Sequence, residues 1–146
     1  MSVKNSRLAY IVEEIEDVLM KLNDQANRGV PVIVEGRKDV KALQRLDVSG
    51  GFLEIKSSKR SIFNRLEHDV VSEEVIIFTD FDRQGSELAR DIQGHLERRG
   101  KKVNILLWRR MRNLVGKDVK DVEGLPSYLE TLKKLSNKPI LGTGLW

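Results

Sequence analysis

Residues 75–85 read Val-Ile-Ile-Phe-Thr-Asp-Phe-Asp-Arg-Gln-Gly, and this stretch decides the fold. Its first five residues form a short, β-branched run with no polar alternation, which is typical of a strand buried on both faces of a parallel sheet. The run passes directly into Asp80 and Asp82, and apolar residues then recur at helical spacing as far as Leu96. The stretch therefore predicts a buried strand, a turn that carries two carboxylates, and a helix that Gly100 ends.

The residues before this stretch predict further strands and helices in alternation. Residues 6–27 carry apolar residues at three- and four-residue steps, which predicts an amphipathic helix with Ser6 as its cap and Gly29 as its stop. Residues 30–34 form a second buried strand that ends at Glu35 and Gly36. The remaining predicted elements are a helix at 38–46, a brief strand at 52–55 and a helix at 59–67.

Downstream, residues 103–108 are predicted as the fourth strand, and a polar stretch then leads to a final helix near 126–135. Strands that alternate with helices imply right-handed crossovers. We therefore expect an α/β fold, a three-layer sandwich around a mostly parallel central sheet of about four strands. A chain of 146 residues fits a single domain.

Composition excludes several classes of protein. The chain has no cysteine, so it has no disulfide frame, thiolate nucleophile or Cys-ligated zinc site. Its longest apolar runs are far shorter than the roughly 20 residues of a membrane-spanning helix, and its first residues lead into no secretory-type apolar core. We expect a cytoplasmic protein that neither spans a membrane nor is secreted.

Positive charge is concentrated in one segment. The net charge is +4, but residues 98–120 hold nine basic residues and one acidic residue. Such a segment, which includes Arg109, Arg110 and Arg112, would attract a polyanion such as a nucleic-acid backbone. The alternative is a solvated basic face that keeps the protein soluble.

Carboxylates end both of the buried strands. If the strands are parallel neighbours, Glu35, Asp80 and Asp82 meet at one edge of the sheet, where a divalent cation would relieve their repulsion. Oxygen ligands without His or Cys favour Mg²⁺ or Mn²⁺, and magnesium sites of this kind usually act on phosphates. Gly36 and Gly85 beside the acids would let backbone N–H groups approach a phosphate. The alternative for each acid is a helix cap or turn residue, a role that Asp39 fits best.

Taken in order, Glu35-Gly36-Arg37-Lys38-Asp39 and Asp80-Phe81-Asp82-Arg83-Gln84-Gly85 resemble the motifs of the Toprim domain. This Rossmann-like module serves bacterial-type primases, type IA and type II topoisomerases, overcoming-lysogenisation-type nucleases and the ribonucleases that mature ribosomal RNA. The resemblance covers residues 30–108, which leaves residues 1–29 as an N-terminal helix and 109–146 as a basic segment and helix. It implies that Glu35 handles protons or helps to hold metal, and that Asp80 and Asp82 bind metal.

The sequence also departs from the family pattern. Topoisomerases of the family carry a further acid where this chain has Gln84. Primases supply later acids in a segment that Lys120-Asp121-Val122-Glu123 resembles, so Asp121 and Glu123 are further metal-ligand candidates, and Asp118 competes with them.

Several other side chains have two interpretations each. Arg37, Lys38 and Arg83, which lie beside the acids, bind phosphate or pair with a neighbouring carboxylate. Trp108 stacks a base or belongs to the core.

These observations lead to three functional hypotheses. The first is a Mg²⁺-dependent phosphodiester hydrolase, a nuclease in which Glu35, Asp80 and Asp82 are catalytic and whose substrate is nucleic acid, with structured RNA favoured over DNA. The second is a non-catalytic nucleic-acid-binding or assembly subunit of a replication or RNA-processing complex. The third, and weakest, is primase-like nucleotidyl transfer, which would consume nucleoside triphosphates.

Overall fold

The computed structural model describes residues 3–55, 63, 64, 66 and 70–137. The strands are β1 (Val32–Val34), β2 (Phe52–Glu54), β3 (Glu74–Ile77) and β4 (Lys102–Asn104). The helices are α1 (Val3–Asn27), α2 (Arg37–Arg45), α4 (Arg83–Glu97), α5 (Leu106–Val115) and α6 (Leu125–Ser136), and a 3₁₀ turn, η1, spans Val122–Gly124. The predicted helix at 59–67 falls largely outside the described residues.

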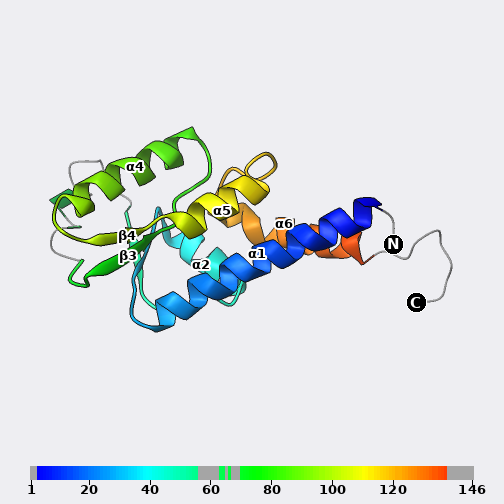
Figure 1. Ribbon diagram of the computed structural model, residues 1–146, viewed down its shortest axis with the longest axis horizontal. Helices are drawn as coiled ribbons and strands as arrows, with labels where there is room; N and C mark the ends of the chain where they lie inside the picture. The colour runs from blue at the N-terminus through cyan, green and yellow to red at the C-terminus, as the bar shows by residue number, and fades with distance from the viewer. Residues whose placement is uncertain (1–2, 56–62, 65, 67–69, 138–146) are drawn as a thin grey trace.

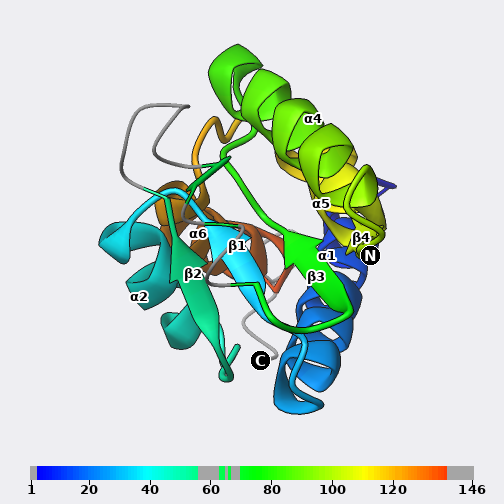
Figure 2. The ribbon, with the colours of Figure 1, turned by 90° about the vertical axis from the view of Figure 1, so that its left-hand side faces the viewer.

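The four strands form one parallel sheet in the order β2-β1-β3-β4. Every residue of β1 is fully buried, and so are Val75, Ile76 and Ile77 of β3. The burial has a simple cause, because α4 covers one face of the sheet while α1 and α2 lie on the other (Figure 1). Figure 2 shows the same arrangement turned by 90°, with β1 between β2 and β3. The predicted α/β three-layer fold with a parallel sheet is confirmed.

The prediction for residues 103–108 is wrong in its second half. The strand ends at Asn104, whose side-chain oxygen accepts a hydrogen bond from Leu106 N–H at 3.0 Å, and α5 begins there. Trp108, Met111 and Val115 are buried, and their spacing of three and four residues is that of one helix face. Arg109, which is exposed, follows the apolar run 105–108 directly. The run alone therefore resembles the end of a strand, and the helical spacing becomes visible only when residues 111 and 115 are included.

The predicted end of the first helix, at residue 27, agrees with α1, but its predicted start at residue 6 does not. The helix begins at Val3, so Ser6 lies inside it and is not its cap. It ends at Asn27, and Gly29 follows with a φ of +95°, in the left-handed region that favours glycine.

A second helical layer is built by α1, α5 and α6. Ile15, Val18 and Leu22 of α1 are buried, and α1 packs against both other helices. Charged pairs join the helices at the rim of this layer. Arg110 of α5 bonds to Glu14 Oε1 at 3.2 Å and to Asp17 Oδ2 at 3.0 Å. Within the described ranges, no helix has the length and apolar character needed to cross a bilayer.

The carboxyl edge of the sheet carries the turns that matter for function. Helix α2 starts three residues after β1, and α4 starts six residues after β3. The β3–α4 turn is held from two sides, because Trp108 Nε1–H donates to Thr79 O at 2.8 Å and Phe81 N–H donates to Lys120 O at 2.8 Å. The two acidic motifs therefore share one edge and a fixed backbone.

Gly85 is required by the close packing of this turn. A Cβ at this position would overlap the backbone carbonyl of Asp80, which cannot rotate away as a side chain could. We expect Gly85→Ala to lower the free energy of unfolding by about 1–3 kcal/mol, the usual cost of overpacking. Urea unfolding measures the change. Gly51→Ala is the control, because its Cβ would meet nothing within 4 Å. Equal stability of the two variants would contradict this account.

Candidate functional site

Glu35 and Asp80 occupy neighbouring strand ends and are in direct contact. Asp80 N–H donates to Glu35 Oε2 at 2.7 Å. Asp80 in turn accepts at Oδ1 from Val122 N–H at 2.9 Å. Three separate segments, the ends of β1 and β3 and the start of η1, thus meet at these two carboxyl groups.

Asp82 and Asp39 cap the helices that follow the strands. Asp82 Oδ1 accepts from Gly85 N–H at 2.7 Å, and Asp39 Oδ2 accepts from Gly36 N–H at 3.0 Å. The cap interpretation of Asp39 is confirmed, and Asp82 is a cap as well. A cap fixes the carboxylate at the edge of the sheet, so this role does not remove Asp82 from the site.

Burial and crowded negative charge raise the pKa of three of these acids. Burial is the main cause for Glu35, whose pKa rises to about 7, and the charge of Asp80 adds to the effect while the Asp80 N–H opposes it. Burial and the charge of Asp80 raise the pKa of Asp39 to about 6. The pKa of Asp80 is raised by burial and by the charges of Asp121 and Asp82, against the opposing hydrogen bond from Val122 N–H. Glu35 can therefore hold or release a proton near neutral pH.

The η1 segment contributes further acids to the cluster. The charges of Asp121 and Glu123 help to raise the pKa of Asp39, and Glu123 lines a hollow of about 480 Å³ together with Glu35 and Asp39. The same hollow is lined by Gly36, Arg37 and Lys38. Asp118, the competing candidate, lies elsewhere and accepts a hydrogen bond from Tyr128 Oη at 2.9 Å.

Asp39 is the member of the cluster that sequence analysis left as a cap only. The signal that could have found it is its place in Glu-Gly-x-x-Asp, where it begins the helix beside Glu35. Only the folded chain shows that it is 8% exposed and faces the charges of the η1 segment.

The residues of the cluster fit a magnesium ion in their chemistry. The donors are all carboxylate oxygens, and burial together with the charges of neighbouring acids raises the pKa of Glu35, Asp39 and Asp80, so their charged forms would gain from a bound cation. As placed, no three acidic or histidine side chains of the described residues converge on a common metal position. Magnesium needs only one or two protein carboxylates and keeps several waters, so this arrangement is compatible with it. Asp80 and Asp82 are the residues that would hold the ion, with Glu35 beside them.

The basic residues predicted to bind phosphate fall into two groups. Three of them are engaged with acids: Arg37 with Glu54 at 3.7 Å, Arg83 with Glu87 at 3.2 Å, and Arg110 with Glu14 and Asp17. Arg110 therefore joins α5 to α1, and it differs from its neighbours in the basic segment. Within the described ranges, Lys38 and Arg109 are exposed and have no acidic partner.

Two further predictions concern side chains near the β3–α4 turn. Trp108 is 3% exposed and its N–H is bonded to Thr79, so it belongs to the core and offers no face for a base. Gln84, which replaces an acid of the topoisomerase pattern, is exposed on the first turn of α4.

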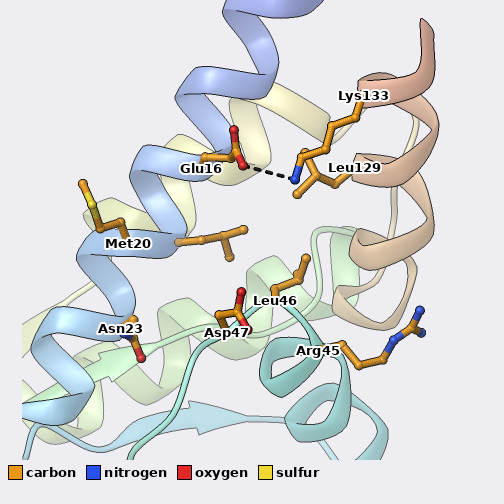
Figure 3. A pocket seen from close by; sticks show the side chains of 9 residues that line it. Glu16, Met20, Asn23, Arg45, Leu46, Asp47, Leu129 and Lys133 are labelled. Carbon is orange, nitrogen blue, oxygen red and sulfur yellow. Dashed lines mark ion pairs between the residues drawn. The ribbon is translucent and has the colours of Figure 1, made fainter. Parts of the chain in front are cut away.

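Another hollow, of about 320 Å³, lies between α1, α6 and the end of α2 (Figure 3). Leu19, Leu46 and Leu129 line it, and a 3.2 Å ion pair between Lys133 and Glu16 crosses its rim. It contains none of the clustered acids. The chemistry of the carboxylates therefore belongs to the hollow beside Glu35.

Comparisons with known proteins agree with this geometry. A family model described as the Toprim domain matches residues 30–108. The chain belongs to the Toprim family. Among relatives of this Toprim protein, a UPF0292 protein of Methanosarcina barkeri is 37% identical over 84% of this chain and 85% of its own length. A UPF0292 protein of Methanocaldococcus jannaschii is 36% identical over 80% of this chain and 91% of its own.

A solved structure of a protein from Aquifex aeolicus is similar in fold to the Toprim protein. Its TM-score is 0.59 at 20% sequence identity, and the match covers 73% of this chain and 94% of that one. The likeness supports the fold, and the Toprim family as a whole points to a metal-dependent protein that acts on or binds nucleic acid.

The raised pKa of Glu35 predicts a pH-dependent stability. Below about pH 4.5 the carboxyl is protonated in both the folded and the unfolded chain, and its contribution to stability is fully present. As the pH rises towards 7, the unfolded chain releases the proton first, so the free energy of unfolding falls. We expect Glu35→Gln to remove about 1–2 kcal/mol of this fall, after allowance for solvent screening of a half-buried group.

Urea unfolding at a series of pH values measures the effect. Glu13→Gln, which changes an exposed carboxylate of α1, is the control and should leave the pH profile unaltered. A Glu35→Gln profile that matches the wild type would show that the carboxyl does not titrate near neutrality.

A divalent cation should stabilise the folded Toprim protein if it binds the acidic cluster, because only the folded chain assembles that cluster. At a hundredfold excess over its dissociation constant the gain is about 2.7 kcal/mol. We expect Mg²⁺ to raise the thermal midpoint of the wild type and of Asp118→Asn, and to leave that of Asp80→Asn unchanged. Scanning calorimetry with Mg²⁺ or EDTA at matched ionic strength tests this expectation. An equal rise in all three proteins would locate the binding elsewhere.

Proposed function

We propose that this Toprim protein is a Mg²⁺-dependent phosphodiester hydrolase that acts on nucleic acid, with structured RNA favoured over DNA. The observation that carries the proposal is that Glu35, Asp39 and Glu123 line one hollow, and that Glu35, whose pKa is about 7, accepts a hydrogen bond from Asp80 N–H. RNA is favoured because the sequence resembles, in its organisation, the ribonucleases that mature ribosomal RNA.

Each acid has a distinct role in this proposal. Asp80 and Asp82 are fixed by backbone hydrogen bonds at the carboxyl edge of the sheet, where they would hold the cation. The bound cation would supply charge stabilisation at the scissile phosphate. Glu35 has a pKa close to neutrality, so it is suited to take the proton of the attacking water. Of Glu35, Asp80 and Asp82, only Glu35 accepts a backbone hydrogen bond from another member of the group, the N–H of Asp80.

The substrate backbone must approach an acidic cluster, and cations beside the cluster favour that approach. Lys38 lines the same hollow as Glu35 and has no acidic partner among the described residues. Its three donors suit a phosphate oxygen, and it lies in the first turn of α2, where backbone N–H groups also favour an anion. Lys38 and the start of α2 are thus suited to hold the phosphate beside Glu35.

The decisive experiment is a cleavage assay on end-labelled structured RNA, single-stranded DNA and double-stranded DNA, with Mg²⁺, Mn²⁺ or EDTA. We expect cleavage of RNA with either metal and none with EDTA. Asp80→Asn and Glu35→Gln should reduce the rate about a hundredfold or more, on the scale of removing one preorganised electrostatic group from an active site.

Asp118→Asn is the matched control for this assay, since it makes the same change in an acid outside the cluster whose partner is Tyr128. Its rate should match the wild type. Metal-dependent cleavage that survives in Asp80→Asn would contradict the proposed site. Salt-sensitive binding without any cleavage would instead indicate a nucleic-acid-binding subunit.

A further inference from the structure

A third cavity, of about 150 Å³, lies between α4 and α5, and none of the clustered acids lines it. Ser86, Arg90 and Gln93 line it from α4, and Trp108, Arg109 and Arg112 line it from α5. Every polar side chain on its wall except the Ser86 hydroxyl and the Gln93 amide is a guanidinium or the indole of Trp108. The cavity is therefore rich in hydrogen-bond donors.

The arginines of this cavity differ from the other arginines near the site in having no counter-charge. Arg83 and Arg110 each bond to acids, but among the described residues no carboxylate pairs with Arg90, Arg109 or Arg112. No acid lines the cavity either. Three positive charges around a small space repel one another, and an anion in that space would attract all three and so offset their repulsion.

The Arg112 guanidinium is held in place before any ligand arrives. Its Nη1–H donates to Ser86 Oγ at 3.1 Å, and its central carbon lies 4.9 Å from the centroid of the Trp108 ring. A guanidinium that is stacked on an aromatic ring and bonded on one side keeps its remaining donors aimed in a fixed direction, which suits the planar, two-point recognition of a phosphate.

We propose that the cavity between α4 and α5 is a phosphate-binding subsite that holds one backbone phosphate of a nucleic-acid strand. The donors fit phosphate oxygens, whereas a base has no place to stack, because the Trp108 ring is covered by Arg112 and its N–H is bonded to Thr79. The inference rests on the proposed function only in taking the ligand to be a nucleic acid.

The subsite is tied to the acidic cluster through the β3–α4 turn. Ser86 Oγ–H donates to Asp82 O at 2.8 Å, and Trp108 Nε1–H donates to Thr79 O at 2.8 Å. Residues on the cavity wall thus bond directly to Thr79, which precedes Asp80, and to Asp82, which follows it by two positions. A strand whose phosphate is held in the cavity is therefore anchored beside the turn that carries Asp80 and Asp82.

Binding of a fluorescently labelled RNA hairpin, measured by anisotropy in EDTA over a series of salt concentrations, tests the inference without turnover. We expect the double variant Arg90→Gln/Arg109→Gln to bind about tenfold more weakly than the wild type. Because both arginines act on the same phosphate, the slope of log K against log salt should fall by about one unit and not by two.

Two further variants act as controls. Arg28→Gln/Arg45→Gln removes the same charge from exposed arginines outside the cavity and should bind like the wild type. Arg109→Lys keeps the charge but loses the two-point fork, so its affinity should lie between the wild type and the double variant. Thermal unfolding followed by circular dichroism checks that all of the variants are folded.

The outcomes separate this inference from the proposed function. If the Arg90→Gln/Arg109→Gln protein binds no more weakly than Arg28→Gln/Arg45→Gln, the subsite is wrong even when metal-dependent cleavage is found. If the cavity variant loses affinity and the wild type cleaves nothing in Mg²⁺ or Mn²⁺, the subsite stands and the hydrolase proposal fails.

Discussion

The hydrogen bond from Asp80 N–H to Glu35 Oε2 is the contact on which the arrangement of the site depends. It exists because β1 and β3 are parallel neighbours, with Val32 opposite Ile76, so that both strands deliver their next residues to the same edge. The pairing continues past the strands, where Phe78 N–H donates to Ile33 O at 2.8 Å. An acid on one strand end is thus fixed by the backbone of the next. Amide donors fix these carboxyl groups in place, while burial raises the pKa of Glu35 and of Asp80, so a cation beside them would stabilise their charged forms.

The sequence predicts the centre of the sheet well and its periphery less well. Residues 75–77 and 32–34 are buried on both faces, so their composition alone identifies them as strands and places the acids after them. Residues 105–108 are also a short apolar run, but residues 106–108 belong to α5, and the apolar positions that share a helix face with Trp108 come only at residues 111 and 115. The composition of four residues cannot separate these two cases. A short apolar run fits both a buried strand and the first turn of an amphipathic helix, and only the residues that follow it distinguish the two.

In the site, too, the sequence predicts features that depend on neighbouring residues and misses those that depend on contacts between residues far apart in the chain. Glu35, Asp80 and Asp82 are found from strand ends, which are local features of the sequence. The contribution of the η1 segment depends on Val122 N–H reaching Asp80, a contact between residues 42 positions apart. The role of Arg110 depends on partners 93 and 96 positions away on α1. A count of charges along residues 98–120 gives no means of separating Arg110 from Arg109, although one joins two helices and the other faces solvent.

The proposed metal site and the proposed phosphate subsite lie at the same turn of this Toprim protein, so binding at one would depend on binding at the other. The β3–α4 turn carries Asp80 and Asp82, and it is bonded to the wall of a cavity whose arginines have no acidic partner among the described residues. A phosphate backbone that lies across the turn gains from the arginines and is repelled by the acids. A cation at the acids removes that repulsion, so it raises the affinity for the backbone, and by thermodynamic linkage the backbone raises the affinity for the cation by the same factor. The turn that Gly85 and Trp108 hold in place would therefore couple the two proposed sites, because it fixes their separation.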